Sequence, residues 1–86
     1  MSYAVRLSRE AERDLLALQR SDRRLYERVL RRLESLADYP RAGKPLVGNH
    51  RGEFSLRVGD YRIVYEIEDA RTIVFVLTVT HRKHVY

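Results

Sequence analysis

One stretch near the middle of the chain constrains the fold more than any other. In SLRVGDYRIVY, residues 55–65, two runs of alternating side chains flank the pair Gly59-Asp60. A two-residue Gly-Asp loop suits the type II′ turn of a β-hairpin. This turn would place Arg57 directly opposite Arg62, and like charges at such a position destabilise a strand pair by about 0.5 kcal/mol. The sequence therefore predicts a hairpin that gathers two guanidinium groups on one sheet face.

Two amphipathic helices are predicted in the first half of the chain. Ser8 is a candidate N-cap for the first helix, and Ser21 or Asp22 is a candidate for the second. The second helix is expected to end near Asp38, because the proline two positions later biases its neighbour away from helical angles. A short joint around residues 19–21 makes the pair an antiparallel hairpin. The apolar positions at helical spacing are Ala11, Leu15 and Leu18, then Leu25, Val29, Leu33 and Leu36.

Strands are predicted at the start and throughout the second half. Residues 3–7 alternate and predict a short strand, whereas residues 41–52 hold three of the four glycines and predict a loop. Strands follow at about 53–58, 61–68 and 72–80, with connections short enough for an antiparallel meander. The order β-α-α-β-β-β predicts one α+β domain over residues 1–86, with a helical hairpin packed on one face of a small antiparallel sheet.

Strand alternation assigns the side chains to two sheet faces. If Ile67 pairs with Ile73, Arg62 lies opposite Thr78. The face toward the helices would carry Phe54, Leu56, Val58, Ile63, Tyr65, Ile67, Ile73, Phe75, Leu77 and Val79. The open face would carry Ser55, Arg57, Arg62, Val64, Val76, Thr78 and Thr80, followed by Arg82, His84 and Tyr86 if the last strand continues. The open face is therefore the candidate site.

The arginine pair is explained if an anion lies between the two groups. A phosphate would turn the repulsion between Arg57 and Arg62 into charge-assisted contacts. In the alternative interpretation, Arg57 pairs with Glu53 or Glu66 or extends into solvent. Those two glutamates face each other in the same register, so a like-charge pair need not carry a function.

The segment HRKHVY, residues 81–86, gathers imidazole, guanidinium, ammonium and phenol groups. Metal-free RNA cleavage needs a base for the 2′-hydroxyl, positive charge for the phosphorane oxygens and an acid for the leaving 5′-oxygen. Histidine acts as base or acid near neutral pH, and tyrosine stacks on a base or moves a proton. The alternative is a polar segment that is only solvated. The candidate catalytic residues are Arg57, Arg62, His81, Arg82, His84 and Tyr86.

The charge and composition favour a nucleic-acid partner and exclude several kinds of site. The net charge of +5 and a pI near 10.0 point to an anionic partner. The absence of cysteine excludes disulfides and thiolate metal sites, and the three histidines have no familiar zinc spacing, so we expect no metal or other cofactor. With no apolar run near 18 residues and no signal-peptide core, we expect a cytoplasmic protein without a membrane partner. The basic run of residues 23–32 is interpreted mainly as a solvated helix face, with steering toward RNA as the alternative.

The element order, the hairpin LRVGDYRIVYEI and the terminal HRKHVY together resemble the RelE/ParE superfamily of type II toxin–antitoxin toxins. The resemblance covers nearly the whole chain, and the tail and LRxGxYR pattern resemble the RelE branch more than the gyrase-directed ParE branch. It implies the RelE-like fold and a toxin that enters the ribosomal A site. Such toxins cut messenger RNA without metal, leave a 2′,3′-cyclic phosphate and so inhibit translation.

The resemblance also implies partners and roles for individual residues. Arg57 and Arg62 would bind phosphate, Arg82 would stabilise the transition state, and Tyr86 would stack on or activate the nucleotide. The implied partners are the ribosome, messenger RNA and a small acidic-tailed antitoxin that forms a hetero-oligomer with the toxin. The expected further RNA contacts are Lys44, Arg51, Ser55 and Lys83.

Two positions depart from this family pattern and leave alternatives open. The best-known RelE-type toxins have lysines on the strand before the Gly-Asp turn, where this chain has Glu53 and Ser55. The general base is therefore unassigned, with His81 or His84 as candidates and Glu53 as a weaker one. The alternative functions are a ParE-like inhibitor of DNA gyrase, which binds without catalysis, and an inactive family member that binds RNA or a partner.

Overall fold

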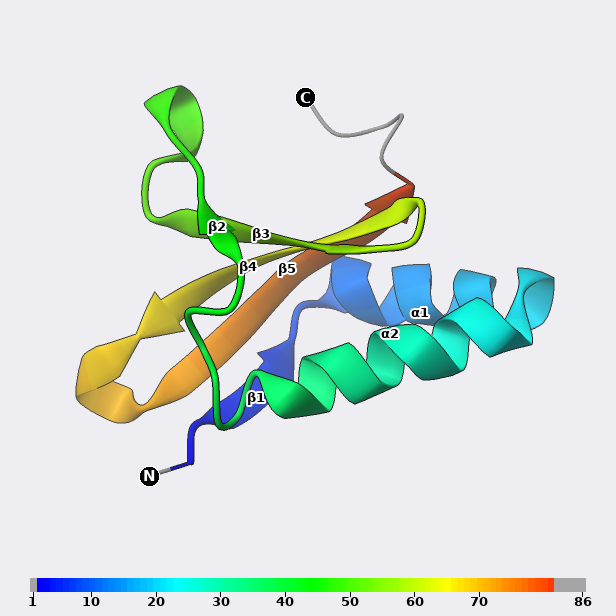
Figure 1. Cartoon of the computed structure of the whole chain (residues 1–86), viewed down its shortest axis with the longest axis horizontal. Coiled ribbons are helices and arrows are strands. Elements are labelled where there is room, and N and C mark those ends of the chain that lie inside the picture. Colours follow the sequence, from blue (N-terminus) through cyan, green and yellow to red (C-terminus); the bar gives the residue numbers. More distant parts are fainter. Residues whose placement is uncertain (1, 82–86) are drawn as a thin grey trace.

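The computed structural model describes residues 2–81 of the chain. In this part of the chain, two helices pack on one face of a five-stranded sheet (Figure 1). The predicted α+β fold is therefore confirmed. The strands are β1 (Ala4–Leu7), β2 (Lys44–Pro45), β3 (Glu53–Val58), β4 (Tyr61–Glu68) and β5 (Ile73–His81); the helices are α1 (Arg9–Ser21) and α2 (Arg23–Ser35), with short 3-10 turns η1 (Gly48–His50) and η2 (Asp69–Arg71).

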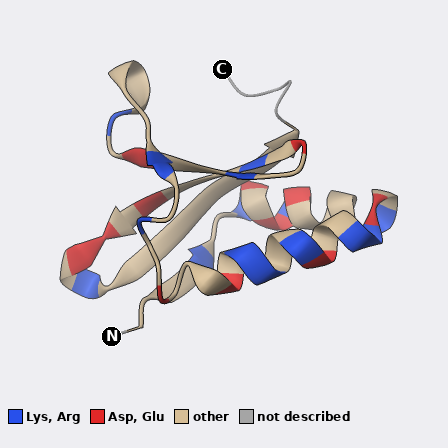
Figure 2. Cartoon of the chain, viewed as in Figure 1, with Lys and Arg blue, Asp and Glu red and all other residues tan. Residues whose placement is uncertain are grey.

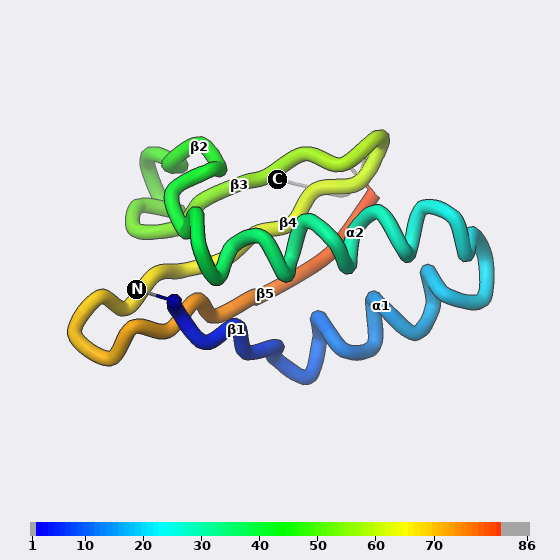
Figure 3. Tube along the Cα trace, turned by 60° about the horizontal axis from the view of Figure 1, so that its bottom comes forward, coloured from blue at the N-terminus to red at the C-terminus, as the bar shows by residue number. Residues whose placement is uncertain are grey.

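The sheet has the order β1-β5-β4-β3-β2. β3, β4 and β5 form the predicted antiparallel meander, while β1 runs parallel to β5 and β2 antiparallel to β3. The two helices run side by side in opposite directions along the sheet (Figure 3). The core lies between the two layers, and its fully buried members include Leu18, Val29, Leu36, Ile63, Tyr65, Val74, Val76 and Val79.

The helix boundaries follow from capping side chains. The hydroxyl of Ser8 accepts a hydrogen bond from the amide of Ala11 at 3.0 Å, which confirms Ser8 as the N-cap of α1. Asp22 alone joins the helices, because its carboxylate caps α2 while its own amide closes the last turn of α1. The predicted joint at residues 19–21 was therefore placed too early. The predicted end of α2 near Asp38 was also wrong, because α2 ends at Ser35. The amides of residues 36–38 donate to carbonyls three positions earlier, whereas an α-helix bonds to carbonyls four positions earlier.

The register of β5 differs from the prediction in two places. Thr72 adopts a left-handed φ of 51° after η2, so β5 starts at Ile73 and that residue pairs with Glu68. Farther along, Val64 pairs with Thr78 and Tyr65 pairs with Val76. Leu77, which lies between Val76 and Thr78, is therefore unpaired and forms a β-bulge. Each change shifts the pairing between β4 and β5 by one residue. The expected pairs Ile67–Ile73 and Arg62–Thr78 were therefore wrong, and Arg62 pairs with Thr80.

These two changes also decide which β5 side chains enter the core. A one-residue slip moves alternate side chains to the other sheet face. Val74 is therefore buried, and so is Val76, which was expected on the open face. Phe75, which was expected in the core, is 37% exposed. The bulge at Leu77 then restores the predicted alternation, and Val79 is buried as expected. Ser8 binds this bulge, because its amide donates to the carbonyl of Val76 at 2.9 Å and its hydroxyl donates to the carbonyl of Leu77 at 2.7 Å.

The predicted loop at residues 41–52 contains a strand that the sequence did not indicate. In β2, Lys44 pairs with Ser55 and Pro45 pairs with Phe54 on the outer edge of β3. Pairing continues past the proline, since the amide of Leu46 donates to the carbonyl of Glu53 at 2.8 Å.

Among residues 2–81, neither helix has the length and apolar character needed to cross a membrane.

Candidate nucleic-acid interface

The hairpin of β3 and β4 has the predicted register. Val58 pairs with Tyr61, and Arg57 lies directly opposite Arg62. Gly59 has a φ of +58°, and the aspartate after it does not have a positive φ, as a type II′ turn requires. The two guanidinium groups therefore originate at one place on the open face of the sheet.

A hollow of about 380 Å³ lies beside this pair, and we call it the arginine pocket. Lys44 reaches it from β2, so three cationic side chains line one hollow at the edge of β3. The residues that line it are Ala42, Gly43, Lys44, Leu46, Ser55, Leu56, Arg57 and Arg62. Four residues predicted from the sequence to contact phosphate or RNA, at positions 44, 55, 57 and 62, are thus brought together.

No carboxylate neutralises the arginine pair within residues 2–81. The Nε of Arg57 donates to the carbonyl of Gly59 at 3.0 Å, and neither Arg57 nor Arg62 forms an ion pair in the part of the chain described. Glu53, one of the alternative partners, lies 3.3 Å from the Nδ1 of His50. The pocket therefore presents positive charge to solvent, which is the condition for binding a phosphate.

The loop that carries Lys44 is held in place by a buried hydroxyl. The hydroxyl of Tyr65 donates to the carbonyl of Pro40 at 2.8 Å and accepts from the amide of Gly43 at 2.9 Å. Burial raises the pKa of Tyr65, so this hydroxyl keeps the proton that it donates. A side chain at position 43 would lie 2.8 Å from both the Tyr65 hydroxyl and the carbonyl of Ser55, so only glycine permits this close approach.

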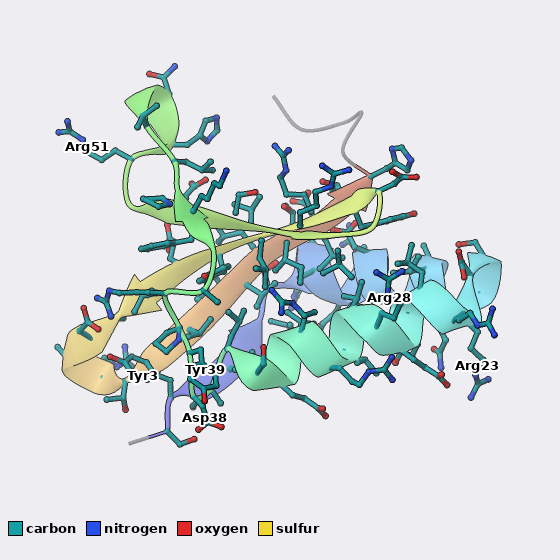
Figure 4. All side chains as sticks on the ribbon, in the orientation of Figure 1. Tyr3, Arg23, Arg28, Asp38, Tyr39 and Arg51 are labelled. Atoms are coloured by element: carbon teal, nitrogen blue, oxygen red, sulfur yellow. The ribbon has the colours of Figure 1, made fainter. Side chains whose placement is uncertain are left out.

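A second basic hollow adjoins the first. It has a volume of about 350 Å³, lies between α2 and the β3–β4 turn, and shares Arg57 with the arginine pocket. Figure 2 shows basic residues along α2, and in Figure 4 Arg28 extends from that helix toward the hairpin. The sequence predicts a solvated face for these helix arginines and does not indicate the cleft, because only the packing of α2 against β3 brings them to Arg57. The cleft is lined by Arg28, Arg31, Arg32, Arg57, Val58 and Gly59.

Other candidate residues lie elsewhere or outside the described part of the chain. His81 pairs with Tyr61 across β4 and β5, and the centroids of their two rings lie 5.5 Å apart in an edge-to-face arrangement. Both side chains lie on the face of the sheet that the helices cover, where His81 lines a hollow together with Asp14 and Ala17 of α1. Arg51 points away from the sheet in Figure 4. Arg82, Lys83, His84 and Tyr86 lie outside the described residues.

Comparisons with known proteins identify similar sequences over nearly the whole chain. A family model described as "ParE toxin of type II toxin-antitoxin system, parDE" matches residues 5–86. The Toxin RelG of Mycobacterium tuberculosis is 41% identical over 87 residues, which cover 100% of this chain and 98% of that protein.

Solved structures share the fold. The toxin–antitoxin complex RelBE2 from Mycobacterium tuberculosis contains a chain with a TM-score of 0.85 and 39% identity, over 95% of this chain and 100% of that one. The YoeB/ParE toxin from Agrobacterium tumefaciens gives a TM-score of 0.81 at 23% identity, with 91% and 96% of the two chains covered. The archaeal RelE–RelB complex from Pyrococcus horikoshii contains a chain with a TM-score of 0.74 and 22% identity, over 99% of this chain and 100% of that one.

Proposed function

Because the chain belongs to the RelE/ParE superfamily of type II toxin–antitoxin toxins, we propose that it cuts messenger RNA on the ribosome and so inhibits translation. The arginine pocket is the observation that carries this proposal. It places Arg57, Arg62 and Lys44 around one hollow that no carboxylate of residues 2–81 neutralises. A phosphodiester of RNA is the ligand that this charge and size suit.

In the proposed reaction, the ribose 2′-oxygen attacks the adjacent phosphorus and the bond to the 5′-oxygen breaks. Arg57 and Arg62 contact the non-bridging phosphate oxygens, where negative charge increases as the phosphorane forms. Preorganised cations at such oxygens favour the transition state over the ground state. The products are a 2′,3′-cyclic phosphate and a 5′-hydroxyl. Arg82 would stabilise further charge, Tyr86 would position the nucleotide, and His81 or His84 would act as the base. The position of His81 on the helix side of the sheet favours His84.

An antitoxin is the proposed protein partner. The solved structures similar to this chain include toxins bound to their antitoxins, from Mycobacterium tuberculosis and Pyrococcus horikoshii. An acidic segment of a cognate antitoxin would place carboxylates where the RNA phosphates bind, and would thereby neutralise the toxin. Ion pairs of that kind weaken as salt increases.

A DNA gyrase inhibitor is the second candidate, because the matching family model is described as a ParE toxin. Such a toxin binds its target without cleaving RNA. The same arginine pocket would then contact acidic side chains or DNA phosphates.

One pair of assays separates the candidates. Purified protein is added to ribosomes translating a defined message and, separately, to a gyrase supercoiling reaction. We expect message cleavage in the first assay and unchanged supercoiling in the second. Arg62→Ala should lose cleavage, whereas Arg23→Ala, which removes an arginine that points away from the hairpin in Figure 4, should retain it. Inhibition of supercoiling with intact message would instead select the gyrase inhibitor.

A further inference from the structure

We propose that Lys44 is the proton donor of the cleavage reaction and that it protonates the leaving 5′-oxygen. This inference rests on the proposed ribonuclease function. It assigns a catalytic role to a residue that the sequence indicated only as an RNA contact in a loop.

The position of Lys44 is the first argument. Lys44 lies on β2 directly opposite Ser55, and Ser55 is two residues before Arg57 on the same face of β3. Its side chain lines the arginine pocket together with Arg57 and Arg62. A phosphate held by the two guanidinium groups would therefore have an ammonium group beside it.

The chemistry of the three cations is the second argument. A guanidinium keeps its protons throughout the working range of an enzyme, so Arg57 and Arg62 stabilise charge but release no proton. An ammonium group carries three protons and becomes a neutral amine when it gives one up. Among the described residues that line the pocket, Lys44 is the one side chain with a charged, transferable proton.

The other acid–base groups nearby occupy different places. His81 lies on the helix side of the sheet with Tyr61 and Asp14, across the sheet from the arginine pocket. Glu53 lies against His50, and both are absent from the lining of the pocket. The arrangement of residues 2–81 thus leaves proton donation at this pocket to Lys44.

The backbone around Lys44 fixes its position on both sides. Before it, the amide of Gly43 donates to the hydroxyl of Tyr65; after it, the amide of Leu46 donates to the carbonyl of Glu53. Tyr65 is fully buried and also binds Pro40, so it holds the entry to β2 against the core. Tyr65 is therefore a positioning residue for the backbone that carries Lys44, and a fixed backbone limits the space that the ammonium group can sample.

The proton and bond changes balance without an external reactant. The 2′-hydroxyl loses its proton to an imidazole, the base proposed above, while its oxygen bonds to phosphorus. The bond from phosphorus to the 5′-oxygen breaks, and that oxygen keeps the electron pair and takes a proton from Lys44. Lys44 is left as a neutral amine and the base as an imidazolium, and transfer of one proton from the imidazolium to the amine through water restores both groups.

The test uses a message with sulfur in place of the 5′-oxygen at the cleaved bond. A thiolate leaves without protonation, because thiols have pKa values near ~8.5. Single-turnover cleavage on ribosomes is measured for wild type, Lys44→Ala and Lys44→Arg with both messages. Lys44→Ala should cut the normal message about 10²- to 10⁴-fold more slowly, the usual effect of losing a general acid. The same variant should cut the sulfur-containing message less than about tenfold more slowly than wild type, because no proton is then needed.

Lys44→Arg separates proton donation from charge. It keeps the positive charge but not the transferable proton, so it should be as slow as Lys44→Ala on the normal message. Tyr65→Phe should show a smaller defect with the same dependence on the leaving group, which a loss of stability alone would not produce. An arginine variant that cuts at the wild-type rate, or equal losses on both messages, would overturn the assignment. Wild-type protein that cuts neither message would instead refute the proposed function.

Discussion

Arg57 and Arg62 face each other across β3 and β4, with no carboxylate of residues 2–81 paired to either. A sheet gains nothing from this arrangement, since like charges directly opposite each other destabilise a strand pair. Lys44 adds a third positive charge to the same pocket. A like-charge pair alone does not mark a site, since Glu53 and Glu66 also face each other. The arginine pair differs because it shares one hollow with Lys44, and this concentration of positive charge suits an anionic ligand.

Replacing Arg62 with alanine should therefore separate activity from stability. Removing one of two like charges should leave the free energy of unfolding within ~0.5 kcal/mol of wild type or slightly higher. Message cleavage should fall by about 10²- to 10³-fold, as for other groups that stabilise transition-state charge. Urea unfolding and single-turnover cleavage measure the two effects, with Arg23→Ala as the matched control. An Arg62→Ala protein that unfolds readily but cuts normally would show a structural role.

Gly43→Ala should destabilise the fold and displace Lys44. The new methyl group would lie 2.8 Å from the hydroxyl of Tyr65 and from the carbonyl of Ser55, both of which are firmly held. Overpacking of this kind typically costs about 1–3 kcal/mol. Gly48→Ala is a useful control, because its site has open space even though its φ of +68° carries a backbone penalty. If thermal unfolding shows equal losses for both variants, the steric argument is wrong.

Asp14→Ala should weaken the attachment of α1 to the sheet edge. The carboxylate of Asp14 accepts a hydrogen bond at 2.9 Å from the amide of Val79, which β1 is too short to reach. Leaving a buried amide without an acceptor costs about 1–3 kcal/mol. Asp14→Asn keeps an acceptor oxygen and should lose less stability in urea unfolding. Equal, negligible losses in both variants would contradict this role.

The register of the hairpin was predictable because its information is local. The Gly-Asp turn fixes which residues of β3 and β4 pair, and the alternation around it agrees with that register. The register of β5 was not predictable, since it depends on the left-handed Thr72 and on the bulge that Ser8 binds from the other end of the chain. Alternation alone cannot reveal a contact between residues so far apart in sequence.

The arginine pocket was predictable in part. Strand alternation placed Arg57, Arg62 and Ser55 on one face, as observed. The strand that carries Lys44 was not predictable, because two residues that include a proline have no strand pattern and depend on the Tyr65 hydroxyl for their position. The cleft formed with α2 is likewise a product of packing between distant segments.

Acid should weaken the contact between the two loops at Asp69. Its carboxylate accepts hydrogen bonds from Arg41 at 2.7 Å and from the hydroxyl of Tyr3 at 2.6 Å. The bond from Arg41, followed by that from Tyr3, holds the pKa of Asp69 below its usual value. Stability from such a carboxylate is present above its ordinary pKa and is lost as the pH falls through the lowered one. The stability difference between wild type and Asp69→Asn should therefore shrink below about pH 4, and an unchanged difference would contradict the assignment.

Variants of the terminal segment test the part of the site that lies outside the described residues. Arg82→Ala and Tyr86→Ala should cut message at least ~100-fold more slowly in single-turnover assays. Binding to ribosomes, which we expect to involve many basic contacts, should change far less. Replacing His84 should also remove a rate inflection near pH 6–7 if its imidazole is the base. Retained toxicity after deletion of residues 81–86 would favour the gyrase inhibitor.

The place of β5 in the sheet also affects when a newly made chain can complete its fold. β5 is the last strand in sequence order, yet it lies between β1 and β4 and supplies Val74, Val76 and Val79 to the core. Pairing β1 with it closes a loop of about 70 residues, an entropic cost near 4 kcal/mol that only the finished sheet repays. A partly synthesised chain therefore contains the arginine hairpin without the framework that holds it. If the chain acts as proposed, we therefore expect activity only after the last strand has been synthesised and paired.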